Sequence, residues 1–302
     1  MTELVVCSGK GGTGKTSVVA GLAALADGLL LADADVDAAN LHLVLSPVRE
    51  RTTPFEAGHT ARIRSRVCAG CGTCQALCRF GAVAHRNTPA GGGVFTVDPL
   101  LCEGCGVCVH FCPEGAIEFV SRTCGELLIS RTPHGPLVHA ALAVGAENSG
   151  KLVSLVRAEA RRLAAALTLD LILVDGPPGI GCPASAALTG ADLTLLVTEP
   201  SQSALHDLHR AADLAAHFDV PAVVCINKHD LSPRLTRNIE ESCGERGLPV
   251  VGRIPFDPAV NEAVAAGRSL IEHAPHSEAA QALTVMWHGI ERRLADLQPA
   301  KG

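Results

Sequence analysis

Apolar residues recur along the chain in short runs separated by longer stretches of mixed polarity. Strands are predicted at six of these runs: 4–7, 29–32, 169–174, 193–198, 222–226 and 250–254. Helices are predicted between or after them, at 17–26, 152–167, 203–217, 234–246 and 279–297. Strands that alternate with helices predict a parallel sheet covered on both faces. Its ligands are expected at the carboxyl ends of the strands.

A glycine-rich loop, GKGGTGKT, follows the first predicted strand. Between a strand and a helix, this pattern is typical of a phosphate-binding loop. Its backbone amides and the helix N-terminus would face phosphate, Lys15 would reach the β- and γ-phosphates, and Thr16 would ligate Mg²⁺. We therefore predict nucleotide-binding residues throughout the loop: Gly9, Lys10, Gly11, Gly12, Thr13, Gly14, Lys15, Thr16 and Ser17.

Three aspartates, Asp33, Asp35 and Asp37, follow the second predicted strand. Carboxylates at this end of a strand beside a phosphate-binding loop would bind Mg²⁺ or order the attacking water. The alternative is a solvated acidic surface.

Composition narrows the class of protein. The chain has 302 residues, a net charge of −6, 47% apolar and 3% aromatic residues. This excludes a disordered chain and disfavours a nucleic-acid partner. The N-terminus does not resemble a signal peptide, and no apolar run reaches the roughly 18 residues of a membrane span, so a cytoplasmic protein without a membrane partner is expected. In that compartment the 13 cysteines are expected to include metal ligands rather than disulfides.

Eight of the 13 cysteines form two runs with the spacing C-x-x-C-x-x-C-x-x-x-C, and adding 34 to the residue numbers of the first run gives the second. Three thiolates two residues apart can hold three corners of a [4Fe-4S] cluster, and the fourth cysteine ligates the other cluster. A zinc site would leave the triple spacing unexplained. The predicted ligands are Cys68, Cys71, Cys74 and Cys112 for one cluster, and Cys102, Cys105, Cys108 and Cys78 for the other.

The chain resembles MinD/Mrp-superfamily P-loop ATPases that contain an inserted two-cluster ferredoxin domain. The resemblance rests on a deviant Walker A loop with Lys10, and on DADVDAAN (33–40), DGPPGIGCP (175–183) and IPFDP (254–258). Residues 63–120 resemble a bacterial-type ferredoxin, although the first cysteine run ends in Cys78-Arg79 rather than Cys-Pro. The implied fold is an α/β parallel-sheet P-loop ATPase domain, 1–62 and 121–302, interrupted by an α+β ferredoxin-like domain, 63–120.

The same resemblance implies further roles for single residues. Lys10 would reach across a homodimer to the partner's nucleotide. Asp35 would belong to switch I and orient the attacking water, and Asp175 would hold Mg²⁺ through water. Lys10 and Lys15, with Mg²⁺, would stabilise charge on the transferred phosphoryl group. Asn227, with the loop that contains Pro255 and Asp257, would recognise adenine. The sequence Asn-Lys-His-Asp at 227–230 taken alone also fits guanine, and the resemblance favours ATP (and ADP) over GTP.

We therefore expect an Mg-dependent ATPase in which a nucleotide-driven homodimer gates electron transfer through two [4Fe-4S] clusters to a redox or metalloprotein partner. One alternative is an ATPase that assembles or carries a metallocofactor. Another is a MinD-like positioning ATPase, although its expected membrane helix is not found. The electron donor and acceptor, the pathway and the resting oligomeric state stay open, as do the roles of Lys151, Cys124 and Cys182.

Overall fold

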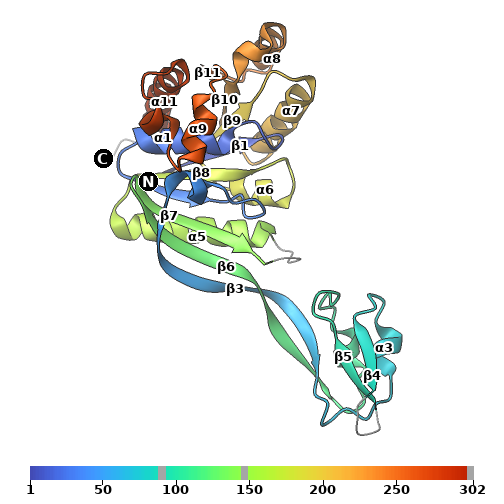
Figure 1. Ribbon diagram of the computed structural model, residues 1–302. Coiled ribbons are helices and arrows are strands. Elements are labelled where there is room, and N and C mark those ends of the chain that lie inside the picture. Colours follow the sequence, from blue (N-terminus) through green and yellow to red (C-terminus); the bar gives the residue numbers. More distant parts are fainter. Residues whose placement is uncertain (88–92, 144–148, 298–302) are drawn as a thin grey trace. The chain divides into compact units, whose positions relative to one another are not determined.

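The structure, a computed structural model, describes residues 1–87, 93–143 and 149–297 (Figure 1). The chain forms two compact units. The first comprises Met1–Thr53, Glu126–Leu142 and Asn148–Gly302, and the second comprises Pro54–Gly125 and Ala143–Glu147. The second unit extends beyond the expected insert of 63–120 because two long strands, β3 (Val48–Ile63) and β6 (Ile117–Thr132), belong partly to each unit.

The first unit is built on a sheet with the strand order β11-β10-β9-β1-β8-β2-β7-β6-β3. Pairing is parallel from β11 to β7. Only two residues join β6 to β7, a connection that requires antiparallel neighbours. The remaining bounds are β1 (Thr2–Ser8), β2 (Leu29–Asp33), β7 (Gly135–Leu142), β8 (Leu171–Pro178), β9 (Leu193–Thr198), β10 (Ala222–Asn227) and β11 (Val250–Ile254).

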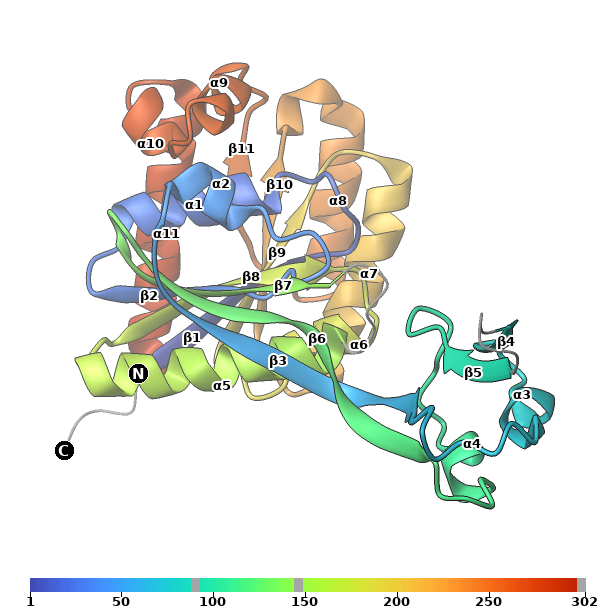
Figure 2. The same ribbon diagram turned by 60° about the horizontal axis from the view of Figure 1, so that its bottom comes forward.

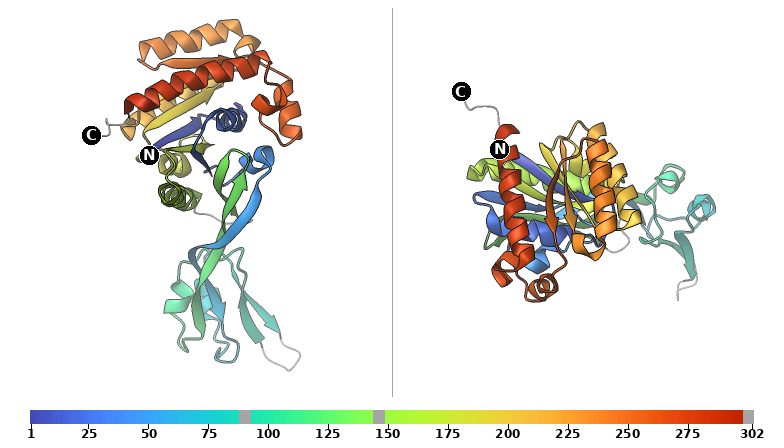
Figure 3. Two further views of the ribbon diagram at one scale, coloured as in Figure 1. Left: turned by 90° about the vertical axis from the view of Figure 1, so that its left-hand side faces the viewer. Right: turned by 90° about the horizontal axis from the view of Figure 1, so that it is seen from above.

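Helices cover both faces of this sheet. On one face lie α1 (Lys15–Leu25) and α11 (Glu278–Leu297), which pack together, and on the other lie α5 (Ser149–Leu167) and α6 (Cys182–Leu188) (Figure 2). Figure 3 shows α11 lying along β11. The other helical segments are α2 (Leu41–Leu45), α7 (Gln202–His217), η1 (His229–Leu231), α8 (Pro233–Glu245), α9 (Ala259–Ala265) and α10 (Leu270–His273).

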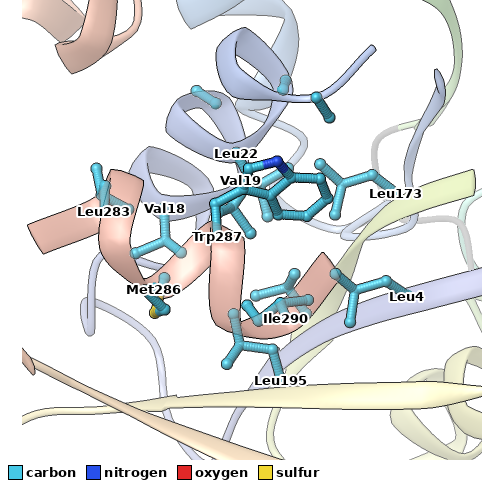
Figure 4. Close-up of a cluster of buried hydrophobic side chains, with 14 of the residues drawn as sticks. Leu4, Val18, Val19, Leu22, Leu173, Leu195, Leu283, Met286, Trp287 and Ile290 are labelled. Carbon is cyan, nitrogen blue, oxygen red and sulfur yellow. The ribbon is translucent and has the colours of Figure 1, made fainter. Parts of the chain in front are cut away.

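The core on the α1 side is filled by the apolar face of α11. Trp287 is 3% exposed and lies among Val19, Leu22 and Leu173, with Ile290 one turn further along the helix (Figure 4). The apolar face of α11 therefore serves packing. Among the described residues, no helix is both long and apolar enough to cross a membrane.

The second unit contains two short helices and a two-stranded antiparallel sheet: α3 (Thr73–Leu77), α4 (Val107–His110), β4 (Val83–Asn87) and β5 (Gly93–Val97). The 34-residue repeat is visible in its backbone. Gly72 and Gly106 precede α3 and α4 with φ of +77° and +74°, a left-handed conformation that only glycine adopts without strain. Cysteines supply much of its small apolar core, in which Phe95 and Ile117 are buried.

Candidate functional site

The glycine-rich loop joins β1 to α1 and leaves its outer face open. A Cβ atom added at Gly11 or Gly12 would meet nothing within 4 Å, whereas one at Gly14 would lie 2.3 Å from Asn227 Nδ2. Among the described residues, the buried hydroxyl of Thr13 has no hydrogen-bond partner. The amides of the first turn of α1 also lack partners within the helix. The loop therefore offers several donors to an anion such as phosphate.

Lys15, at the start of α1, is buried against two carboxylates. Its Nζ atom lies 2.5 Å from Asp175 Oδ1 and 3.5 Å from Asp35 Oδ2. The hydroxyl of Thr16 donates to Asp175 Oδ2 at 2.8 Å. Burial opposes the charge on Lys15, but Asp175, Asp35 and Asp33 together outweigh this effect and raise the pKa of Lys15. The structure thus brings together the lysine, hydroxyl and two carboxylates that the sequence assigned to the phosphates and Mg²⁺.

Strand register explains why the carboxylates meet. Asp33 at the end of β2 is paired with Asp175 on β8. Asp33 is fully buried, and its carboxylate accepts hydrogen bonds from the backbone amides of Asp35 and Leu41, both at 3.1 Å. Burial, together with Asp175, raises the pKa of Asp33 well above its usual range. From the sequence, Asp33 is only one member of the acidic cluster. In the structure its hydrogen bonds fix the backbone at Asp35 and at the start of α2.

Asn227, which is expected to contact adenine, lies against the glycine-rich loop, and the loop after β11 lies against Asp230. The side-chain amide of Asn227 donates to the carbonyl of Thr13 at 2.8 Å. The amide of Phe256, within the loop of Pro255 and Asp257, donates to Asp230 Oδ1 at 2.6 Å. Asp230 is thereby linked to this loop through one of its two carboxylate oxygens.

The start of the loop packs against α7. A Cβ atom at Gly9 would lie 2.4 Å from the backbone of Asp207. Lys10 forms an ion pair with Glu199, with 2.8 Å between Nζ and Oε1. Ser17 is half-buried in the first turn of α1. All nine loop residues predicted to bind nucleotide therefore lie between the end of β1 and the first turn of α1.

The second unit holds a cavity among its cysteines. Three cysteines of the first run and one of the second line it, together with Phe95 and Ile117: Cys68, Cys71, Cys74 and Cys112. The amide of Ala116 donates to Cys112 Sγ at 3.3 Å. This is the mixed set of four thiols that the spacing predicts for one cluster, so the residues fit such a group. In the part of the chain that the structure describes, no three Cys, His, Asp or Glu side chains are placed to hold a single metal ion.

The exposed cysteine occupies the equivalent position in the two cysteine runs. Six of the eight cysteines pack into the small core, while Cys71 and Cys105, at equivalent positions in the repeat, are exposed. Burial raises the pKa of Cys108, and the neighbouring Cys102 and Cys105 raise it further. Burial likewise raises the pKa of Cys74, with Cys68 and Cys71 contributing. In each run the first three thiols are thus close enough to influence one another electrostatically.

Comparison with known proteins identifies the nucleotide-binding unit. Residues 4–271 match the family described as the CobQ/CobB/MinD/ParA nucleotide binding domain. The chain belongs to this family. The uncharacterized protein MJ0578 of Methanocaldococcus jannaschii is 33% identical over 233 residues, which are 76% of this chain and 79% of that protein.

Solved structures of MinD and ParA proteins have a similar fold. The septum site-determining protein MinD of Pyrococcus horikoshii OT3, complexed with Mg-ADP, has a TM-score of 0.59 and 18% identity, covering 99% of both chains. A ParA family ATPase from Chlorobium tepidum TLS has a TM-score of 0.55 and 18% identity, covering 95% of this chain and 98% of its own. The expected MinD/ParA-type P-loop fold is confirmed. The ferredoxin-like insert and its clusters stay predictions.

The sequence did not reveal a pair of stacked histidines on α2 and β7. The rings of His42 on α2 and His139 on β7 are 5.9 Å apart, and His139 Nε2 is hydrogen-bonded to Ser130 at 2.9 Å. Their signal in the sequence is weak, because each histidine stands alone in its segment. Burial, with His42 and Arg49 adding to it, lowers the pKa of His139 to about 4.

Acidification is therefore expected to destabilise the protein through His139. An unfolded histidine binds a proton near pH 6.5, whereas the folded His139 resists protonation until about pH 4. The stability that His139 contributes is complete above pH 6.5 and is lost as the pH falls toward 4. In His139→Gln, the fall in melting temperature between pH 7.5 and pH 5 should be smaller than in the wild type by a few degrees. The exposed His288→Gln serves as the control; equal pH dependence of all three proteins would contradict the assignment.

Proposed function

We propose that this protein is an Mg-dependent ATPase whose nucleotide state controls electron transfer through two [4Fe-4S] clusters. The observation that carries the proposal is the cavity lined by Cys68, Cys71, Cys74 and Cys112, in a chain that also holds the Lys15 and Asp175 site. Four thiols contributed by both runs match the crossed ligation of two-cluster ferredoxins.

Each residue of the proposed nucleotide site would have a separate role. Lys15 would contact the β- and γ-phosphates, and Thr16 and Asp175 would hold Mg²⁺, which neutralises phosphate charge when bound. Asp35 is placed next to Lys15 and would orient the attacking water. Asn227 and the Pro255–Asp257 loop would contact adenine. The Mg-ADP complex of the Pyrococcus horikoshii MinD supports a magnesium nucleotide at this site.

The physical connection between the two activities lies in the chain that follows Asp35. Asp33 holds the amide of Leu41, at the start of α2, and β3 begins three residues after α2 ends. Strand β3 then continues into the cysteine-containing unit. A change at Asp35 when the γ-phosphate is lost would thus move α2 and the start of β3, the segment that connects the nucleotide site to the cysteine-containing unit. Other nucleotide switches work in this way.

A homodimer belongs to the proposed cycle. Lys10 would contact the nucleotide of the second copy, so that ATP assembles the dimer and hydrolysis releases it. The MinC:MinD complex of Aquifex aeolicus shows that a member of this fold binds a partner protein. For the present chain we propose a redox protein or metalloprotein partner.

A MinD-like positioning role is the second candidate, favoured by the structural likeness to MinD over nearly the whole chain. It requires a nucleotide-dependent change of location and no cluster chemistry. A third candidate, the assembly or delivery of a metallocofactor, shares the cysteines with the leading proposal. It differs in that iron would leave the protein during turnover.

Electron transfer under different nucleotides separates these candidates. An Asp35→Ala variant, expected to retain ATP, would first be used anaerobically to capture the partner. The reduced wild-type protein should then pass electrons to that partner several-fold faster with ATP than with ADP, with its iron retained. Equal rates would refute gating, and transfer of iron to an apo-protein would favour the delivery role. Localisation that depends on ATP but not on the cysteines would favour positioning.

A further inference from the structure

The side chain of Lys10 is fully occupied within its own chain. Its Nζ atom lies 2.8 Å from Glu199 Oε1, and it donates to Ser201 Oγ at 3.2 Å and Ser203 Oγ at 3.3 Å. An ammonium group has three N–H donors, and these three acceptors use all of them. Lys10 is therefore held at the β9–α7 connection of its own protomer.

The same carboxylate also binds a second lysine. Lys228 Nζ lies 3.1 Å from Glu199 Oε2 and donates to the carbonyl of Gly12 at 3.1 Å. Burial opposes ionisation of Glu199, but Lys10 and Lys228 outweigh this effect and lower the pKa of the carboxyl group. Glu199 thus forms ion pairs with both Lys10 and Lys228 on the same side of the phosphate-binding loop.

Strand order creates this arrangement. Strand β9, which leads into Glu199, lies between β1 and β10, whose ends carry Lys10 and Lys228. The backbone of Lys10 is fixed as well, because the hydroxyl of Ser8 donates to its carbonyl at 2.8 Å. Only the side chain of Lys10 has to swing if it is to leave its own protomer.

We infer that Glu199 is a positioning residue that retains Lys10 within its own protomer and so sets how readily two copies associate on ATP. This rests on the proposed homodimer, in which Lys10 contacts the nucleotide of the second copy. To make that contact, Lys10 must give up Glu199, Ser201 and Ser203 in each protomer. Lys228 then remains as the counterion of Glu199.

The first test is the strength of the dimer. Glu199→Gln keeps the shape of the side chain and removes its charge, and Asp35→Ala in all proteins prevents hydrolysis. A partly exposed ion pair changes an equilibrium constant by a factor of up to about five. If Glu199→Gln raises the equilibrium constant for releasing Lys10 by about threefold in each protomer, the effect of two protomers multiplies to about tenfold. The dissociation constant of the ATP-bound dimer, measured by analytical ultracentrifugation, should then be about ten times lower in Glu199→Gln. Ser203→Ala, which removes one acceptor of Lys10, should act in the same direction.

The matched control is Glu240→Gln, because Glu240 pairs with Arg253 at 2.9 Å on the same unit, away from the loop. It should leave the dimer constant unchanged. A dimer of Glu199→Gln that is equal to or weaker than the wild type overturns the inference.

The second test does not require a dimer. Acetylation of lysine amines by dilute acetic anhydride, followed by mass spectrometry on the nucleotide-free protein, reports how freely Lys10 reacts. In Glu199→Gln, Lys10 should react several-fold faster relative to the exposed Lys151 in the same sample. An unchanged rate overturns the inference. If the wild type never dimerises with ATP while Lys10 reacts faster in the variant, the contact is real and it is the proposed dimer that fails.

Discussion

Replacing Lys15 by alanine is expected to abolish ATP hydrolysis. Lys15 Nζ is the cation between Asp175 and Asp35, and it is placed to contact the transferred phosphoryl group. Loss of one such group typically lowers kcat by about 10²–10³-fold. We expect at least this loss in phosphate release measured with saturating Mg-ATP.

The same substitution should also destabilise the protein, because it leaves buried Asp175, and Asp35 beside it, without their cation. Breaking a buried ion pair costs on the order of 3 kcal/mol, and chemical denaturation would measure it. Lys151→Ala, on the exposed side of α5, should change neither quantity. Hydrolysis by Lys15→Ala within tenfold of the wild type would show that Lys15 has no role in catalysis.

Substitution of single cysteines is expected to remove one cluster at a time, in a pattern that crosses the two runs. Cys74→Ala and Cys112→Ala should each lower iron from about eight to about four atoms per protomer, because both belong to one cluster. The double variant Cys74→Ala/Cys112→Ala should lose no more iron than either single variant. By contrast, Cys74→Ala combined with Cys78→Ala should lose both clusters.

Cys225→Ala is the control for this series. Cys225 is fully buried in β10 of the first unit and belongs to neither cysteine run. Its replacement should leave the iron content unchanged. If iron loss in Cys74→Ala/Cys112→Ala were additive, the two cysteines would belong to different clusters and the assigned ligand sets would be wrong.

The nucleotide-binding half of the site could be predicted from the sequence because its signals are local. The spacing of Gly9, Gly14, Lys15 and Thr16 places phosphate-binding groups on one loop, and strand ends deliver Asp35 and Asp175. Two strands, 193–198 and 250–254, have the predicted bounds in the structure. A continuous motif or an apolar run can thus be located from the sequence without knowing which distant residues it contacts.

Features that depend on distant partners were not predictable. Strands β3 and β6 contain many exposed polar positions, so no apolar run marks their length or their place at the edge of the sheet. Glu199 is a single glutamate after a strand, and its importance arises only when strand order places Lys10 and Lys228 beside it. Asp33 gains its role from pairing with β8, which is separated from it by more than a hundred residues.

The central claim is that the cysteine unit holds two [4Fe-4S] clusters under the control of an ATPase, and the composition of the anaerobically purified wild-type protein tests it most directly. Iron, acid-labile sulfide and zinc would be quantified per protomer, with electron paramagnetic resonance after reduction. We predict about eight iron and about eight sulfide atoms and a spectrum of reduced [4Fe-4S] clusters. Zinc in place of iron, or iron without sulfide, would contradict the account.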